Sequence, residues 1–249
     1  MSGHSKWANI KHRKSQQDAK KGKAYTKVIK ELSVAAKSGT DPEANPRLRM
    51  AIQAARGVNM PSDTIKRAIA KGSGQYDDGS RIEEILYEGY GAGGIAVLVE
   101  AITDNKNRTV GELRHVFARH GGNLAEAGCV AWMFSKKGFV QVLKANIEED
   151  ALLGLILDVG VDDVTSGDNS WEIYCAPSLL EQILKLLKDN SIEVESSELA
   201  MLPQSYIAVA GKQAQQVLSL VEALEDHEDV ETVWTNLDIP DEELQKLVS

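Results

Sequence analysis

The 249-residue chain lacks several features that would narrow its role at once. It has only two cysteines, Cys129 and Cys175, and both lie in apolar, strand-like runs, which predicts reduced core residues rather than a disulfide framework. No stretch approaches the roughly 18 apolar residues of a membrane span, and the start has no apolar segment like that of a secretory signal. The sequence therefore predicts a cytoplasmic protein.

Motifs of catalysis and metal binding are also missing. His115 and His120 are five residues apart, which does not place two ligands on one helical face, so structural or capping roles are favoured. The run GYGAGG at 89–94 lies between two expected strands, whereas a dinucleotide fingerprint needs a strand followed by a helix, so a glycine-rich hairpin is favoured. We therefore expect no cofactor, no metal and no enzymatic activity.

What the sequence does have is a strong separation of charge. Residues 1 to 72 carry 16 Lys and Arg against 5 Asp and Glu, a net of +11, whereas residues 73 to 249 carry 12 against 32, a net of −20. The whole-chain charge of −9 hides this basic head on an acidic body. Such a division predicts that the head meets a polyanion and that the body does not.

The cations are densest at the very start, and phosphate backbone is their expected target because each bound phosphate releases a condensed counterion. A solvated basic face is the alternative for a lysine cluster. Trp7 favours binding, since its ring can stack on an unpaired base, although a lone Trp can also anchor the arm. The candidate nucleic-acid-binding residues are Lys6, Trp7, Lys11, His12, Arg13, Lys14, Lys20, Lys21, Lys23, Lys27 and Lys30.

The head is predicted to be a mobile arm followed by three helices. Residues 1 to about 20 have too few apolar residues to pack alone. A first helix then carries apolar residues at helical spacing and ends at Gly39. A second begins at Asn45-Pro46 and ends at Gly57, and a third begins near Pro61-Ser62 and ends at Gly72.

The body alternates short strands with helices. We expect strands at about 82–89 and 94–103, a helix at 107–120 and a strand at 129–135. From Gly138 a βαββαβ unit follows, with strand 139–143, helix 148–158, strands 162–166 and 171–176, a helix opened by Pro177 and strand 192–198. A strand at 205–209, a helix at 212–225 and a strand at 230–236 then complete the earlier segment.

The predicted fold is α+β with three domains. A basic three-helix domain at 1–75 precedes two ferredoxin-like α/β domains, and the second of these is inserted into the first. The discontinuous domain covers 76–135 plus 204–249, and the inserted βαββαβ domain covers 136–203.

Several long segments resemble one known family. They are GHSKWANIKHRK and KKGKAYTKVIKEL near the start, the block NPRLRMAIQAARGVNMPSDTIKRAIAKGSG, and in the body YEGYGAGGIAVLVEAITDNKNRT and HGGNLAEAGCVAWMF. In this order, and almost end to end, they are similar to the YebC family, which includes the mitochondrial translational activator of cytochrome c oxidase subunit I. Ala92 stands where many relatives have proline, and Thr64 and Lys66 stand where Asn and Glu are frequent, which makes the third helix more basic.

The resemblance implies a non-enzymatic, nucleic-acid-binding regulator of gene expression. Members are commonly described as cytoplasmic DNA-binding transcriptional regulators, and this function is placed first. The alternative is an RNA- or ribosome-associated translation factor, with the arm on ribosomal or transfer RNA and the acidic body against basic ribosomal proteins. An enzyme acting on nucleic acid is a third, disfavoured class. No membrane partner is expected, and the sequence does not choose between DNA and RNA.

Overall fold

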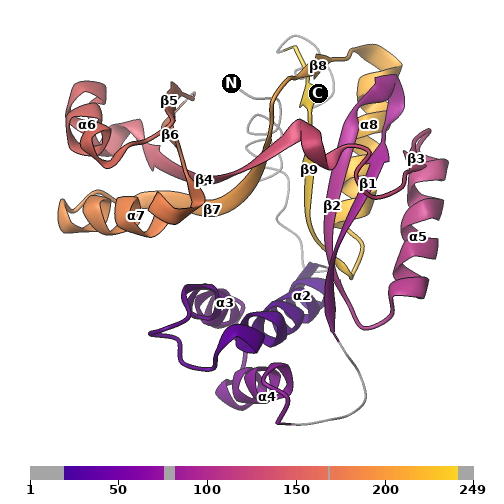
Figure 1. The fold of residues 1–249 in the computed structure, drawn as a ribbon, viewed down its shortest axis with the longest axis horizontal. Coiled ribbons are helices and arrows are strands. Elements are labelled where there is room, and N and C mark those ends of the chain that lie inside the picture. Colours follow the sequence, from indigo (N-terminus) through magenta and orange to yellow (C-terminus); the bar gives the residue numbers. More distant parts are fainter. Residues whose placement is uncertain (1–19, 76–81, 168, 241–249) are drawn as a thin grey trace.

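The protein is described by a computed structural model that covers residues 20–75, 82–167 and 169–240 (Figure 1). The predicted arm lies almost entirely outside the described residues, as does most of the linker that follows the head. Among the described residues, no helix is long and apolar enough to cross a membrane.

Three helices form the head, as predicted. They are α2 (Lys20–Ala35), α3 (Pro46–Gly57) and α4 (Ser62–Gly72). A short 3-10 turn extends α2 to Gly39, whose φ of 142° suits glycine. Asn45 caps α3, because its Oδ1 accepts a hydrogen bond from the Leu48 N–H at 3.1 Å.

Small residues let the three helices of the head pack closely. Leu32, Leu48 and Ile65, one from each helix, share a core filled out by alanines. A Cβ added at Gly72 would lie 2.0 Å from the Ser33 carbonyl oxygen, so α4 packs directly on the backbone of α2. The Ser33 hydroxyl also donates to the Ala68 carbonyl at 3.1 Å. The position of α4 against α2 is therefore fixed at its C-terminal end.

The middle unit is a four-stranded antiparallel sheet of order β3-β1-β2-β9. Its strands are β1 (Glu83–Tyr90), β2 (Ala96–Thr103), β3 (Asn123–Leu124) and β9 (Val230–Thr235). Helices α5 (Lys106–Arg119) and α8 (Gly211–Glu225) cover one face, and their apolar residues share a core with Val97, Val99 and Val233. Two short strands, β8 (Ile207–Ala208) and β10 (Leu237–Asp238), pair in parallel beside it.

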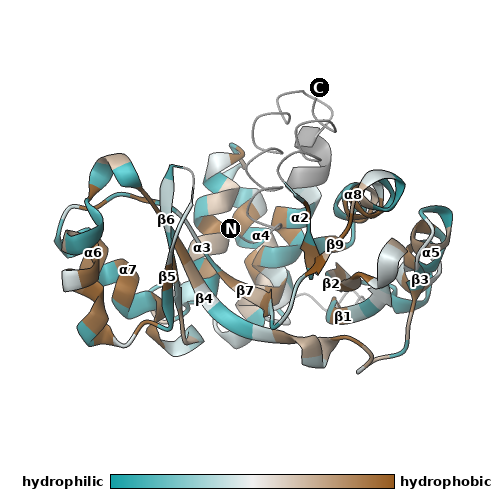
Figure 2. Ribbon diagram, turned by 90° about the horizontal axis from the view of Figure 1, so that it is seen from above, coloured by the Kyte–Doolittle hydropathy of each residue, from teal (hydrophilic) through white to brown (hydrophobic). Residues whose placement is uncertain are grey.

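The inserted unit has the predicted βαββαβ order. Its elements are β4 (Phe134–Leu143), α6 (Glu149–Ile156), β5 (Asp163–Ser166), β6 (Ser170–Cys175), α7 (Leu180–Asp189) and β7 (Val194–Pro203). The antiparallel strand order β5-β6-β4-β7 is that of the split βαβ pattern. Figure 2 shows the two sheet-containing units side by side, with α6 and α7 at one end and α5 and α8 at the other.

The predicted strand at 129–135 is wrong over most of its length. Residues Ala131–Met133 form a 3-10 turn, and one strand, β4, begins only at Phe134. The reason is the buried carboxylate of Glu88, which accepts the backbone N–H groups of Gly128, Val130 and Ala131 at 2.6, 2.7 and 2.8 Å. Those three donors are therefore unavailable to a β-ladder.

Strands β4 and β7 form a continuous ribbon between the two sheets. They pair from Phe134 opposite Pro203 to Val142 opposite Val194, with one register shift near Gln141. In Figure 1 this ribbon runs from the inserted unit to the middle unit. The connection is thus made of paired strands rather than of loose linkers.

Candidate nucleic-acid interface

The eleven predicted site residues fall into three groups. The six in the arm, Lys6, Trp7, Lys11, His12, Arg13 and Lys14, lie outside the described residues. Lys20, Lys21 and Lys23 lie in the first turn of α2, where only the backbone is described. Lys27 and Lys30 are described with their side chains, and both are turned toward the body.

Lys27 and Lys30 bind the turn between α8 and β9. The Lys27 Nζ donates to the Glu225 carbonyl at 2.7 Å, and the Lys30 Nζ donates to the Glu228 carbonyl at 3.1 Å. Lys30 also forms an ion pair with Asp229, and its side chain is only 16% exposed. In this arrangement the two ammonium groups hold the head on the body.

Asp229 is the centre of this contact and is 1% exposed. Besides Lys30, its carboxylate accepts hydrogen bonds from the Arg108 guanidinium at 3.0 Å and from the Thr109 hydroxyl at 2.7 Å. Burial alone would raise the pKa of Asp229, but the hydrogen bonds from Lys30, Thr109 and Arg108 outweigh it and lower the pKa to about 2. Asp229 is therefore ionised at neutral pH and ties α2, α5 and β9 together.

Three more cations of the head contact the body. Lys37 donates to the Ile82 carbonyl, where the body begins. The Arg47 guanidinium bridges Glu31 of its own domain, at 2.7 Å, and Glu84 of β1, at 2.9 Å. Arg49 reaches Glu181 of the inserted unit at 3.5 Å.

Acidic side chains of the middle sheet face the head near Arg47. Burial, together with a hydrogen bond to Glu84 and the charge of Glu84, raises the pKa of Glu100 to about 7. Burial likewise raises the pKa of Glu231 to about 7, with the charge of Glu31 adding to the effect. At this junction the basic head therefore contacts an acidic face of the middle sheet.

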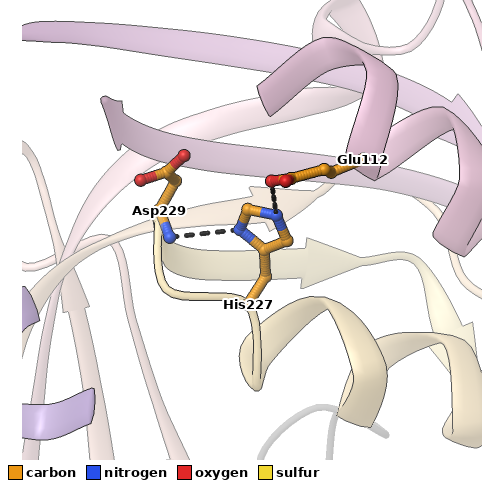
Figure 3. A group of neighbouring side chains, drawn as sticks. All are labelled: Glu112, His227 and Asp229. Atoms are coloured by element: carbon orange, nitrogen blue, oxygen red, sulfur yellow. Dashed lines mark hydrogen bonds and ion pairs between the residues drawn. The ribbon is translucent and has the colours of Figure 1, made fainter. Parts of the chain in front are cut away.

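One group of side chains has a composition that could suggest a metal site. Glu112, His227 and Asp229 place one potential ligand atom each within 4.8 Å of one another (Figure 3). However, the ring nitrogens of His227 are engaged, Nε2 with Glu112 at 2.9 Å and Nδ1 with the backbone N–H of Asp229 at 3.1 Å. The Asp229 carboxylate is bound by Lys30 and Arg108, so a metal ion would have to displace two cations. The group fastens α5 to the α8–β9 turn.

The other motifs singled out in the sequence have structural places. The glycine-rich run forms the predicted hairpin between β1 and β2, closed by the Gly91 N–H and the Ile95 carbonyl at 2.8 Å. His120 is the C-cap residue of α5, and His115 is exposed on the same helix. Both cysteines are free, with Cys175 buried.

Sequence reasoning missed the head–body contact because its partners are far apart in the chain. Lys30 and Asp229 are 199 residues apart, and no local pattern around either residue indicates the other as its partner. The available signal was a coarse one, namely that a head of +11 and a body of −20 attract each other.

Comparison with known proteins agrees with this architecture. Residues 5–75 match the family described as the TACO1/YebC protein N-terminal domain, and residues 82–237 match the TACO1/YebC second and third domain. The chain therefore belongs to the TACO1/YebC family.

Named relatives and a solved structure match over nearly the whole chain. A protein of Koribacter versatilis called a probable transcriptional regulatory protein is 51% identical over 247 residues, 99% of each chain. One of the same description from Solibacter usitatus is 50% identical over 249 residues, again 99% of each. The crystal structure of a conserved hypothetical protein from Aquifex aeolicus has a TM-score of 0.80 at 42% identity and covers 90% of this chain and 92% of its own.

Proposed function

We propose that the protein is a non-enzymatic regulator of gene expression that binds nucleic acid through its basic head. The observation that carries the proposal is the charge division, +11 in residues 1 to 72 against −20 in the rest. The names of the relatives support a regulatory role. The first candidate function is that of a DNA-binding transcriptional regulator.

The physical basis is generic phosphate binding. Each head cation that contacts a phosphate releases a counterion, so affinity falls with salt by a log–log slope of about −0.9 per contact on duplex DNA. The acidic body is repelled by phosphate, but screening confines this repulsion to about 8 Å at physiological salt. The body can therefore lie near a nucleic acid without weakening the contact made by the head.

The charge of the body also supports a second candidate function. A body with a net charge of −20 is suited to binding basic proteins, which are abundant on ribosomes. In this candidate function the head would bind ribosomal or transfer RNA, and the body would bind a ribosomal protein. This alternative is an RNA- or ribosome-associated translation factor.

Salt titration of binding tests the proposed role of the head. We expect the full chain to bind duplex DNA or RNA with a steep salt dependence, and a fragment beginning at residue 76 to bind neither. Combining Lys11→Ala, Arg13→Ala and Lys14→Ala should make the salt slope less steep by roughly two to three contacts without changing thermal stability. The matched control removes two Lys and one Arg from the body with Lys185→Ala, Lys188→Ala and Arg114→Ala.

Two results would contradict the proposal. One is equal affinity of the headless fragment and the full chain at physiological salt. The other is an unchanged slope in the arm variant. Crosslinking in cells followed by sequencing of the bound nucleic acid separates the two candidate functions, because promoter DNA and ribosomal RNA give different read maps.

A further inference from the structure

We propose that the outer face of the α3–α4 hairpin, carrying Arg56, Lys66 and Arg67, is a phosphate-backbone-binding surface of the head. Lys27, Lys30 and Arg47 have a different task, which is to hold the head on the body. The inference rests on the proposed function and specifies which described residues perform it.

Most of the other described cations of the head are already engaged within the protein. Five of them already bind other groups of the protein, and Lys71 also has an interaction within the chain. The five are Lys27, Lys30, Lys37, Arg47 and Arg49. A phosphate that contacted Lys30 would have to compete with the buried carboxylate of Asp229. The described lysines of α2 that could bind a polyanion are thus already bound to groups of the protein itself.

Helix geometry places Arg56 on the side of α3 opposite the contact with the middle unit. Arg47 and Arg56 are nine residues apart on α3, which corresponds to about two and a half turns, so they lie on opposite sides of the helix. Arg47 is held toward the middle unit by Glu84. Arg49, two turns before Arg56 on roughly the same side, reaches Glu181 of the inserted unit, whereas the exposed Arg56 side chain has no hydrogen bond or ion pair with any residue that the structure describes.

The same reasoning applies to α4. Ile65 and Ala68 are buried in the head core, whereas Lys66 and Arg67, which lie between them in the sequence, are exposed. Within the described part of the chain, neither cation has a hydrogen bond or ion pair. Figure 1 shows α4 on the side of α2 that faces away from β2, at the lower edge of the view.

The hairpin is also fixed in shape, so its cations are presented by a rigid support. Four residues connect α3 to α4, and Met60 in this turn is buried while its N–H donates to the Ala55 carbonyl at 2.9 Å. Asn59 takes a left-handed φ of 57°. With Gly72 packed on Ser33 at the far end of α4, both ends of this helix are held. A preorganised surface loses less conformational entropy on binding than a mobile one.

One acidic side chain lies on the same helix, but it does not reverse the charge of the surface. Asp63 is exposed one turn before Arg67 and forms no ion pair with it. Three cations and one carboxylate leave a net charge of +2, which is complementary to phosphate.

The test uses the full chain and two probes, a duplex DNA and a single-stranded RNA, titrated with salt. The variant combines Arg56→Ala, Lys66→Ala and Arg67→Ala, which should make the salt slope less steep by roughly two to three on duplex DNA. Thermal unfolding should be unchanged, because the three side chains are exposed and have no partners among the described residues. A second variant, Lys66→Arg with Arg67→Lys, preserves the charge and should keep the slope.

Two controls separate local contact from net charge. Arg114→Ala, Arg119→Ala and Lys212→Ala remove the same two Arg and one Lys from exposed positions on α5 and α8, and should leave the slope unchanged. Lys30→Gln should also leave the slope unchanged while lowering the stability of the fold.

The possible outcomes distinguish the inference from the proposed function. If the full chain binds with a steep salt dependence but the α3–α4 variant keeps its slope, the inference is overturned and the proposed function stands. The inference is also overturned if Lys30→Gln or the body control lowers the slope as much as the α3–α4 variant does. If the full chain binds neither probe, the proposed function itself fails. A loss confined to the α3–α4 variant, on either probe, supports the surface and shows which nucleic acid it prefers.

Discussion

At the scale of single residues, the most informative side chain is Asp229. Its ion pair and hydrogen bonds join the head to the body, yet its sequence neighbourhood, EDHED, predicts only a solvated turn. A buried carboxylate is stable only when cations and donors surround it, and here Lys30, Arg108 and Thr109 come from two other helices. No local pattern encodes such a convergence, so the ion pair of Lys30 with Asp229 could not be predicted from the sequence.

Replacing Asp229 should destabilise the protein strongly. Asp229→Ala leaves Lys30 and Arg108 without their shared acceptor, and breaking such a buried pair costs on the order of 3 kcal/mol. We expect a lower midpoint in urea-induced unfolding, measured by circular dichroism. Glu222→Ala, which removes an exposed carboxylate from α8, is the control and should change the midpoint little. An Asp229→Ala midpoint equal to that of the control would show that the ion pair contributes nothing.

At the scale of elements, local capping signals predicted well and long-range hydrogen bonds did not. The second head helix begins at Pro46 and ends at Gly57 as the Asn-Pro and Gly signals indicate. The segment at 129–133 has strand-like apolar residues, but Glu88, some 40 residues away, takes its backbone donors. The sequence could therefore predict where helices begin, whereas this loop depends on a partner that only the fold brings near.

The Asn45 cap offers a test at this scale. Its Oδ1 accepts from Leu48, and its Nδ2 donates to the carbonyls of Ala35 and Gly39 at 2.7 and 2.8 Å. Asn45→Ala should lower the stability of the head by about 1–2 kcal/mol, the usual cost of a lost N-cap. Hydrogen exchange of the α3 amides measures this locally. Ser62→Ala at the exposed start of α4 is the matched control, and equal exchange in both variants would exclude a stabilising cap.

At the scale of the whole molecule, the inserted unit should fold on its own. Its main core cluster of buried residues, from Val140 to Leu187, is formed entirely within residues 134–203. A fragment of these residues should therefore unfold cooperatively on heating, with coincident far-UV and near-UV transitions. The predicted boundary at 136 would remove the first two residues of β4, so the 134–203 fragment is the better test. Loss of near-UV signal without a transition would instead indicate one merged α/β domain.

The junction between head and body should also give the whole molecule a pH dependence. Glu100 and Glu231 have pKa values raised to about 7, above the ordinary value near 4.3 of an unfolded chain. A group whose pKa rises on folding contributes stability that is complete below the unfolded value and is lost as pH rises through the folded value. We therefore expect these two carboxyl groups to make the fold less stable as pH rises from about 4 through 7. Asp229, with its pKa lowered to about 2, acts in the opposite sense, and its contribution is lost only as pH falls from about 4 toward 2.

Substitution of the two carboxyl groups isolates this effect. Glu100→Gln with Glu231→Gln removes both titrations while keeping the size of the side chains, so the variant should gain stability over the parent protein at pH 8 by on the order of 1 kcal/mol or more. At pH 4, below the unfolded pKa near 4.3, both groups are largely protonated in either state, so the two proteins should differ little. Urea unfolding at the two pH values measures the difference, and the other titrating groups cancel in the comparison. A constant gap between variant and parent from pH 4 to 8 would mean that these carboxyl groups do not take up protons at the junction. Arg47 and the lysines of α2 would then neutralise the acidic face of the sheet completely.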